Sequence, residues 1–264
     1  MITGKTKLYF IIADPISQVR TPEVFNAYCA QNGSDAVMVP IQVAPEGLEA
    51  VMTAFRAMKN LGGVVVTVPH KTAVALLCDE LGEAGRAIGS VNAVRREADG
   101  RLVGNMFDGA GFVAGLRSQG YEPAGRRALL VGAGGAASAI AFALAEAGVA
   151  SLTIANRTPA KAEEIVLRIA KSFPGRTIRV GDADPAGHDL VINATSLGLK
   201  PGDHLPVDPA LLTPVMTVAE IVMKPETTPL LAAAQARGCA VHYGRHMLDQ
   251  QFRLIADFIG ATGC

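Results

Sequence analysis

Lys71 occupies a position in the sequence that suggests chemistry. It follows the apolar segment Gly63–Val68, which stops at Pro69. Sheets of α/β proteins place reactive groups at the ends of buried strands. A lysine there could give a proton to a carbonyl oxygen or help to remove one from an alcohol; a solvated surface lysine is the plain alternative. His70 is a second acid–base candidate, although on a strand-to-helix turn its ring can point away.

Asp108 and Asn92 are further polar candidates. Asp108 either caps the helix that follows it, or orients substrate hydroxyls and stabilises a protonated Lys71. The sequence leaves these two readings open. Asn92 stands in the otherwise apolar segment Val91–Val94. If it is buried it needs a hydrogen-bond partner, and a substrate hydroxyl is one candidate.

A glycine-rich turn gives the strongest local motif, Val131-Gly132-Ala133-Gly134-Gly135-Ala136-Ala137. It follows the apolar strand expected at Ala128–Val131 and opens an Ala-rich helix that ends near Ala147. Such a turn lets the backbone approach a pyrophosphate at the helix N-terminus. The strand before and the helix after it favour a dinucleotide site over a purely structural turn.

The end of the next strand indicates which dinucleotide is bound. An NAD site would normally carry Asp or Glu there, but this chain has Asn156-Arg157-Thr158, with Lys161 one turn later. Two cations, a hydroxyl and no carboxylate fit the 2′-phosphate of NADP. Further along, Asn193 and Thr195 end another apolar strand, where they either cap a turn or contact the nicotinamide side.

Short β-branched runs alternate with Ala-rich segments of helical spacing, which predicts an α/β fold. A helix is expected at Pro22–Gln31, capped by Thr21 and stopped at Gly33. A final amphipathic helix is expected at Met247–Ile259, able to pack on either domain. The expected strands are Leu8–Ala13, Val37–Val43, Val64–Thr67, Val91–Val94, Ala128–Val131, Leu152–Ala155, Thr177–Val180, Leu190–Asn193 and Thr217–Val222.

The amino-acid composition limits the classes of partner that we expect. The 264 residues carry 24 basic and 24 acidic side chains, so no net field recruits nucleic acid or an anionic membrane, and a small molecule is the better expectation. The four cysteines have no metal-like spacing and read as free thiols. Neither a signal peptide nor a membrane span is apparent. We therefore expect a cytoplasmic protein, a monomer or homodimer without a metal.

Taken in order, these segments resemble the shikimate dehydrogenase family over essentially the whole chain. The segments are Asp14-Pro15-Ile16, Val66-Thr67-Val68-Pro69-His70-Lys71, Ile88-Gly89-Ser90-Val91-Asn92-Ala93-Val94, Asp108-Gly109-Ala110-Gly111, the Gly132 motif, Asn156-Arg157-Thr158, Ile192-Asn193-Ala194-Thr195-Ser196, Thr228-Pro229-Leu230-Leu231 and Gly244-Arg245-His246-Met247-Leu248-Asp249-Gln250-Gln251.

The resemblance implies an N-terminal α/β substrate domain (1–105 and 245–264), a Rossmann-like NADP-binding domain (106–244) and a cleft between them. It makes Lys71 and Asp108 the catalytic pair. Substrate hydroxyls would be held by Thr67, Asn92 and Gln251. NADP would be held by Gly132, Gly134, Gly135, Ala136, Asn156, Arg157, Thr158 and Lys161, with Asn193 and Thr195 beside them.

Several positions depart from the family pattern where the family binds the substrate carboxylate. A serine-rich segment is replaced by Gln18-Val19-Arg20-Thr21-Pro22, and a tyrosine by Met223. Apolar residues also replace polar ones at Val65 and at Met106-Phe107. Thr21 keeps one hydroxyl, and Arg20 could grip a carboxylate or be a solvated charge. Shikimate itself could therefore be a poor substrate.

The resemblance predicts an NADP-dependent oxidoreductase that interconverts a ring alcohol and ketone, namely shikimate and 3-dehydroshikimate or a related hydroxylated cyclic acid. Two alternatives stay open. One is a regulatory module that binds NADP and a metabolite without turnover. The other is an enzyme like methylene-tetrahydrofolate dehydrogenase, although that would call for a tyrosine at position 67, which is Thr. A glutamyl-tRNA reductase would need a nucleophilic cysteine and a basic surface, and neither is apparent.

Overall fold

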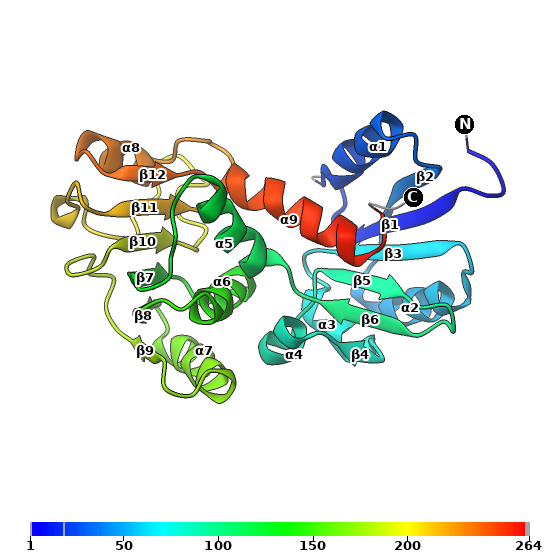
Figure 1. Ribbon diagram of the computed structural model, residues 1–264, viewed down its shortest axis with the longest axis horizontal. Helices are drawn as coiled ribbons and strands as arrows, with labels where there is room; N and C mark the ends of the chain where they lie inside the picture. Colours follow the sequence, from blue (N-terminus) through cyan, green and yellow to red (C-terminus); the bar gives the residue numbers. More distant parts are fainter. Residues whose placement is uncertain (1, 18, 262–264) are drawn as a thin grey trace. The chain divides into compact units, whose positions relative to one another are not determined.

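The computed structural model of the chain describes residues 2–17 and 19–261 (Figure 1). The chain forms two compact units, Met1–Phe107 with Arg253–Cys264, and Asp108–Phe252. The chain passes between the units at 107/108 and 252/253, whereas the resemblance implied 105/106 and 244/245. Within the described residues, no helix combines the length and apolar character needed to cross a membrane.

The first unit is built on a mixed six-stranded sheet in the order β2-β1-β3-β5-β6-β4. Strand β1 pairs in parallel with β2 and β3, while β5 runs antiparallel to both β3 and β6. The strands are β1 (Lys7–Ala13), β2 (Ala36–Gln42), β3 (Leu61–Val66), β4 (Glu80–Leu81), β5 (Ala93–Arg96) and β6 (Leu102–Asn105).

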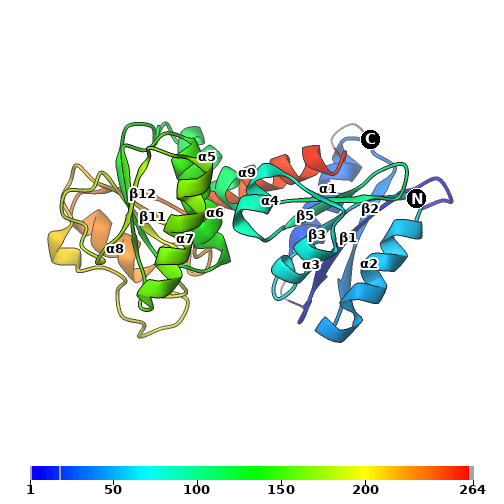
Figure 2. The ribbon, with the colours of Figure 1, turned by 90° about the horizontal axis from the view of Figure 1, so that it is seen from below.

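Helices cover both faces of this sheet. They are α1 (Thr21–Gln31), α2 (Leu48–Ala57), α3 (Lys71–Leu77) and α4 (Glu83–Ile88), with a 3-10 turn at Pro45–Gly47. Helices α2 and α3 share one apolar core with alternate residues of β1 and β3, and Figure 2 shows both on the same side of the sheet. On the opposite face, the ring of Phe25 in α1 packs at 4.9 Å from that of Tyr9.

The expectation that Thr21 caps α1 is wrong. Thr21 is the first helical residue, and Arg20 occupies the capping position without a side-chain cap bond. The helix starts there because the Arg20 carbonyl already accepts from the backbone N–H groups of Glu23 and Val24. The expected stop is confirmed, since Gly33 adopts a positive φ of 69° just beyond the end.

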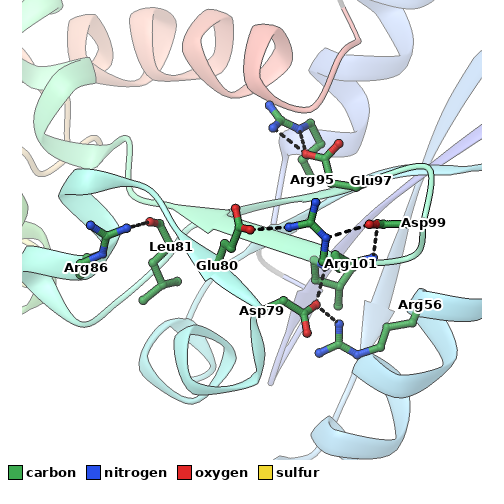
Figure 3. Close-up of polar contacts among 10 residues, drawn as sticks. Arg56, Asp79, Glu80, Leu81, Arg86, Arg95, Glu97, Asp99 and Arg101 are labelled. Carbon is green, nitrogen blue, oxygen red and sulfur yellow. Dashed lines mark hydrogen bonds and ion pairs between the residues drawn. The ribbon is translucent and has the colours of Figure 1, made fainter.

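Ion pairs fasten the outer strands of the first unit (Figure 3). Arg101 pairs with Asp99 at 2.8 Å and also with Glu80 in β4. Asp79 accepts from the Leu102 N–H at 2.7 Å and pairs with Arg56 of α2. These contacts, the backbone bond first, hold the pKa of Asp79 below its ordinary value. The β5–β6 hairpin is thereby tied to β4 and α2.

The second unit has a parallel six-stranded sheet in the order β12-β11-β10-β7-β8-β9. Counted from β7, this is the doubly wound order 3-2-1-4-5-6 of dinucleotide-binding folds, and it confirms the expected fold class. The strands are β7 (Arg127–Val131), β8 (Ser151–Ala155), β9 (Thr177–Val180), β10 (Leu190–Asn193), β11 (Thr217–Glu220) and β12 (Ala240–His242).

Its helices are α5 (Asp108–Ser118), α6 (Gly135–Glu146), α7 (Pro159–Ser172), α8 (Pro229–Ala236) and α9 (Gly244–Phe258), with a 3-10 turn at Pro209–Leu211. Helices α5, α6 and α7 pack on one face of the sheet, and α8 packs on the other. Helix α9 begins at Gly244, three residues earlier than expected, and ends at Phe258. Its residues through Phe252 belong to the second unit, and the remainder belong to the first.

Candidate active site

The glycine turn after β7 has the geometry of a pyrophosphate cradle. Gly132 has φ of 122°, which favours glycine. Gly134 stands at the cap position of α6 and brings no side chain to it. A Cβ placed on Gly134 or Gly135 would meet nothing within 4 Å. The first N–H groups of a long helix therefore face open space, as anion binding requires.

The carboxyl ends of β7 and β10 lie side by side at the point where the strand order reverses. Ligands of doubly wound sheets bind at this switch point. Asn193, which ends β10, is buried and hydrogen-bonded within its own loop. Its Oδ1 atom accepts from the N–H and the hydroxyl of Thr195 at 3.1 and 2.7 Å. Of the two readings for these side chains, the structure shows the turn.

The cationic set expected at the 2′-phosphate stands at the end of β8 and the start of α7. Arg157, Thr158 and Lys161 are exposed. The Thr158 side chain makes no cap hydrogen bond to α7, and Asn156 donates to the Thr158 carbonyl at 2.8 Å. Within the described residues, no carboxylate forms an ion pair with Arg157 or Lys161. The set fits the 2′-phosphate of NADP.

In the first unit, Lys71 is the first residue of α3, just beyond the carboxyl end of β3. Its carbonyl accepts from the Val91 N–H at 3.0 Å. His70 is buried, with its Nε2 atom 2.7 Å from the Val43 carbonyl oxygen. Since the His70 ring is held in the core, Lys71 is the stronger acid–base candidate of the two.

Asn92 lies one residue before β5 rather than inside it, because β5 begins at Ala93. Its carbonyl accepts from the Val66 N–H at 2.8 Å, and its side-chain Oδ1 accepts from the Phe107 N–H at 2.9 Å. The buried amide therefore joins the β3 end, from which Thr67 and Lys71 follow, to the residue that precedes Asp108.

Asp108 is the first residue of α5, and only 3% of it is exposed. The side-chain amide of Gln251, in α9, donates a hydrogen bond to the Asp108 carboxylate. The expectation placed Gln251 on a substrate hydroxyl; the structure places its amide on the candidate catalytic carboxylate. Gln251 thus helps to orient Asp108.

The positions that depart from the family pattern fall into two groups. Val65 and Met106 are core residues, and the Phe107 ring packs 5.1 Å from that of Phe258. Arg20, by contrast, is exposed and pairs with the equally exposed Glu23 at 2.7 Å, which is the solvated-charge reading of this residue.

Val19 is partly buried, Thr21 begins α1 and Met223 is half exposed. Gln18 lies outside the described residues. No side chain among these three carries a charge with which to hold a carboxylate.

Two residues of the second unit escaped the sequence reasoning. Glu220 ends β11 fully buried, and His242 ends β12 at 2% exposure. The sequence could have indicated Glu220, because it is an acidic residue within an expected strand, and a buried carboxylate needs hydrogen-bond partners. Among the described residues, no three His, Cys, Asp or Glu side chains gather as metal ligands.

A glycine turn at the switch point of a doubly wound sheet, with cations after the second strand, defines a dinucleotide-dependent dehydrogenase. A family profile described as "Shikimate dehydrogenase substrate binding domain" matches residues 11–94, and one described as "Shikimate / quinate 5-dehydrogenase" matches residues 117–197. The chain belongs to the shikimate dehydrogenase family of oxidoreductases, as the resemblance predicted.

Individual relatives agree. The shikimate dehydrogenase (NADP(+)) of Rubrobacter xylanophilus is 44% identical over 95% of this chain and 89% of its own length. The shikimate 5-dehydrogenase of Listeria monocytogenes, solved with shikimate and NAD, is 32% identical with a TM-score of 0.91, covering 100% of this chain and 98% of its own. The ligand-free 5-ketofructose reductase of Gluconobacter sp. strain CHM43 is 35% identical with a TM-score of 0.90, covering 97% and 93%.

Proposed function

We propose that the chain is an NADP-dependent dehydrogenase that interconverts a ring alcohol and ketone, shikimate and 3-dehydroshikimate or a related hydroxylated cyclic acid. The observation that carries this is the joint presence of three features in a chain 44% identical to an NADP-dependent shikimate dehydrogenase. They are the open glycine turn, the exposed cations after β8, which form no ion pair with a described carboxylate, and Lys71 just beyond the end of β3. NADP(H), when bound, supplies or accepts the hydride.

The protein's own groups would transfer the proton and position the substrate. We assign proton transfer at the substrate oxygen to Lys71, assisted by Asp108. A carboxylate stabilises the protonated form of a lysine and so keeps it ready to donate. Thr67 and Asn92 lie on the same unit as Lys71 and are assigned to substrate hydroxyls. Gln251 is assigned to the orientation of Asp108.

A second candidate substrate class is a neutral polyhydroxy ketone such as 5-ketofructose. A specific observation favours it, because Arg20 pairs with Glu23 and Val19 and Met223 offer no charge. The 5-ketofructose reductase named above is also 35% identical. A site without a cation for the carboxylate would discriminate less against uncharged substrates.

The test follows NADPH absorbance at 340 nm with shikimate, quinate and a panel of cyclic alcohols in the oxidative direction, and with 5-ketofructose in the reductive direction. NAD(H) runs in parallel. Turnover of shikimate with NADP supports the first substrate class, and turnover of 5-ketofructose alone supports the second. Cofactor binding without turnover of any compound would replace both with a regulatory module.

We further propose that the enzyme works in the cytoplasm as a monomer or homodimer. Cys78 and Cys239 are free thiols, which suits a reducing compartment. Burial raises the pKa of the Cys78 thiol to about 12, so this residue is a poor nucleophile. Light scattering of the purified protein would test the assembly.

A further inference from the structure

Glu220 is a fully buried carboxylate that the proposed reaction does not use. It ends β11, next to β10 in the sheet and one strand further from the glycine turn than Asn193. A buried carboxylate is costly unless hydrogen-bond donors surround it. The groups that contact this carboxyl therefore indicate its role.

Every partner of the Glu220 carboxylate is a donor. Oε1 accepts from the Ile221 and Val222 N–H groups at 2.9 and 3.0 Å. Oε2 accepts from the Thr228 hydroxyl at 3.0 Å and from the Asn193 side-chain amide at 2.9 Å. Burial raises the pKa of this carboxyl, while these hydrogen bonds oppose the shift. A set made only of donors fits the ionised form, which accepts at both oxygens.

The carboxylate fixes which way the Asn193 amide faces. Because the Asn193 nitrogen points to Glu220, its oxygen must point to the opposite side. There it accepts from the N–H and hydroxyl of Thr195. The Thr195 hydroxyl in turn accepts from the Leu197 N–H at 3.0 Å, and the Leu197 carbonyl accepts from the Asn193 nitrogen at 2.9 Å. The Asn193 amide thus links Glu220 to the hydrogen bonds of the 194–197 segment.

That segment lies directly against the glycine turn. A Cβ on Gly132 would come within 2.6 Å of the Ala194 carbonyl oxygen and 3.2 Å of the Thr195 nitrogen. The backbone of the turn and that of the segment are therefore in contact with no side chain between them. A shift of the segment must also move Gly132, because the two backbones are close-packed.

We propose that Glu220 is a positioning residue for the cofactor: through Asn193 and Thr195 it holds the 194–197 segment against the Gly132 turn and so sets the affinity for NADP(H). This inference rests on the proposed function, in which that turn binds the pyrophosphate. It assigns Glu220 a role in cofactor binding at a distance, with no contact to the cofactor.

The test compares wild-type protein with Glu220→Gln and with the control Glu226→Gln. Glutamine keeps the shape but turns an N–H₂ group toward donors, so Asn193 loses its acceptor. Loss of such an acceptor corresponds to about a tenfold or greater rise in the Kd for NADPH. Glu226 is an exposed carboxylate that pairs with Arg245, and its loss should leave the Kd within about twofold of the wild-type value.

The Kd is measured by NADPH fluorescence titration, and KM values for cofactor and ketone substrate by steady-state kinetics. The inference requires a raised cofactor Kd and KM with an unchanged substrate KM. A merely structural role would lower the unfolding temperature and the fraction of active protein, without raising the cofactor KM relative to the substrate KM. Adding Thr195→Val to Glu220→Gln should not weaken NADPH binding further, because both changes break the same chain of hydrogen bonds through Asn193.

An unchanged NADPH Kd in a folded Glu220→Gln protein would overturn the inference. If that variant does not fold, Glu220→Asp carries the test: it keeps the charge but is too short to hold both Asn193 and Thr228. A raised Kd in this variant supports the inference, and an unchanged one overturns it. A wild-type protein that fails to bind NADPH would instead refute the proposed function.

Discussion

Replacing His242 with Gln should remove a large part of the acid sensitivity of the second unit. His242 ends β12 at 2% exposure, and its ring lies nearly perpendicular to that of Phe112 in α5, with the ring centroids 5.7 Å apart. Its Nδ1 atom lies 3.3 Å from that of His246 in α9. Within the described part of the chain, its Nε2 atom has no hydrogen-bond partner. A proton added there would be a buried charge without an acceptor.

Burial first, and the charge of His246 second, lower the pKa of His242 from 6.5 to about 4. Between these two values the unfolded chain binds a proton that the folded chain does not. The stability that the neutral His242 ring contributes is therefore fully present above pH 6.5 and falls as the pH drops through that value. The loss stops below about pH 4. With these two pKa values, the loss at pH 5 relative to pH 7.5 is about 2 kcal/mol.

The assay is equilibrium urea unfolding at pH 7.5 and pH 5.0, with the free energy of unfolding extrapolated to water. Wild-type protein should lose about 2 kcal/mol more than His242→Gln between the two pH values. Any packing loss caused by glutamine cancels, because each protein is compared with itself. His204→Gln, which removes an exposed ring, serves as the control.

Equal pH-dependent losses in the wild-type and His242→Gln proteins would refute this reasoning. They would mean that the ring takes up its proton in the folded state at little cost. The pKa of His246 is also lowered, chiefly by burial. Since His246 is present in both proteins, its contribution cancels except for the part that comes from its contact with His242.

Four further outcomes are expected. Lys71→Ala should lower kcat by about 10²- to 10⁴-fold with a smaller change in KM; full activity on the true substrate would exclude the assigned proton transfer. Arg157→Ala should raise the KM for NADP by about 10- to 100-fold and spare that for NAD, in parallel steady-state assays. Gly109→Ala should cost about 3 kcal/mol in urea unfolding, because the new Cβ would lie 1.9 Å from the Ala139 carbonyl oxygen. Gly134→Ala, which meets open space, should unfold like wild type and bind NADPH more weakly.

The sequence predicted the second unit better than the first. Strands β9 and β10 fall on the expected residues, and β7 and β8 differ by one. Buried parallel strands are apolar runs, which stand out between helices. The hairpin strand β6, Leu102–Asn105, and the three-residue β12 were missed, because short strands carry too little pattern to distinguish them from loops.

Within the candidate site, the sequence located correctly the residues that stand where a strand ends, while their roles stay predictions. Lys71 and the glycine turn stand at such ends. Predictions about side-chain partners fared differently, because two readings of one residue share the same spacing. Asn193 could have faced a ligand or its own loop; in the structure its amide bonds to Leu197 and Thr195 of the loop and to Glu220, 27 residues away. No local pattern contains that information.

Backbone packing, together with the Gln251 side chain, holds Asp108, the proposed partner of Lys71. Helix α5 carries glycines on the sides that meet its neighbours: a Cβ on Gly109 would strike the α6 backbone, and one on Gly115 would come within 2.9 Å of the His246 backbone in α9. Close-packed backbones allow little sliding. The start of α5 is thus fixed between α6 and α9, the helix that supplies Gln251 to Asp108. Because α6 begins at the glycine turn proposed to bind the pyrophosphate, the same packing connects the proposed acid–base carboxylate to that turn.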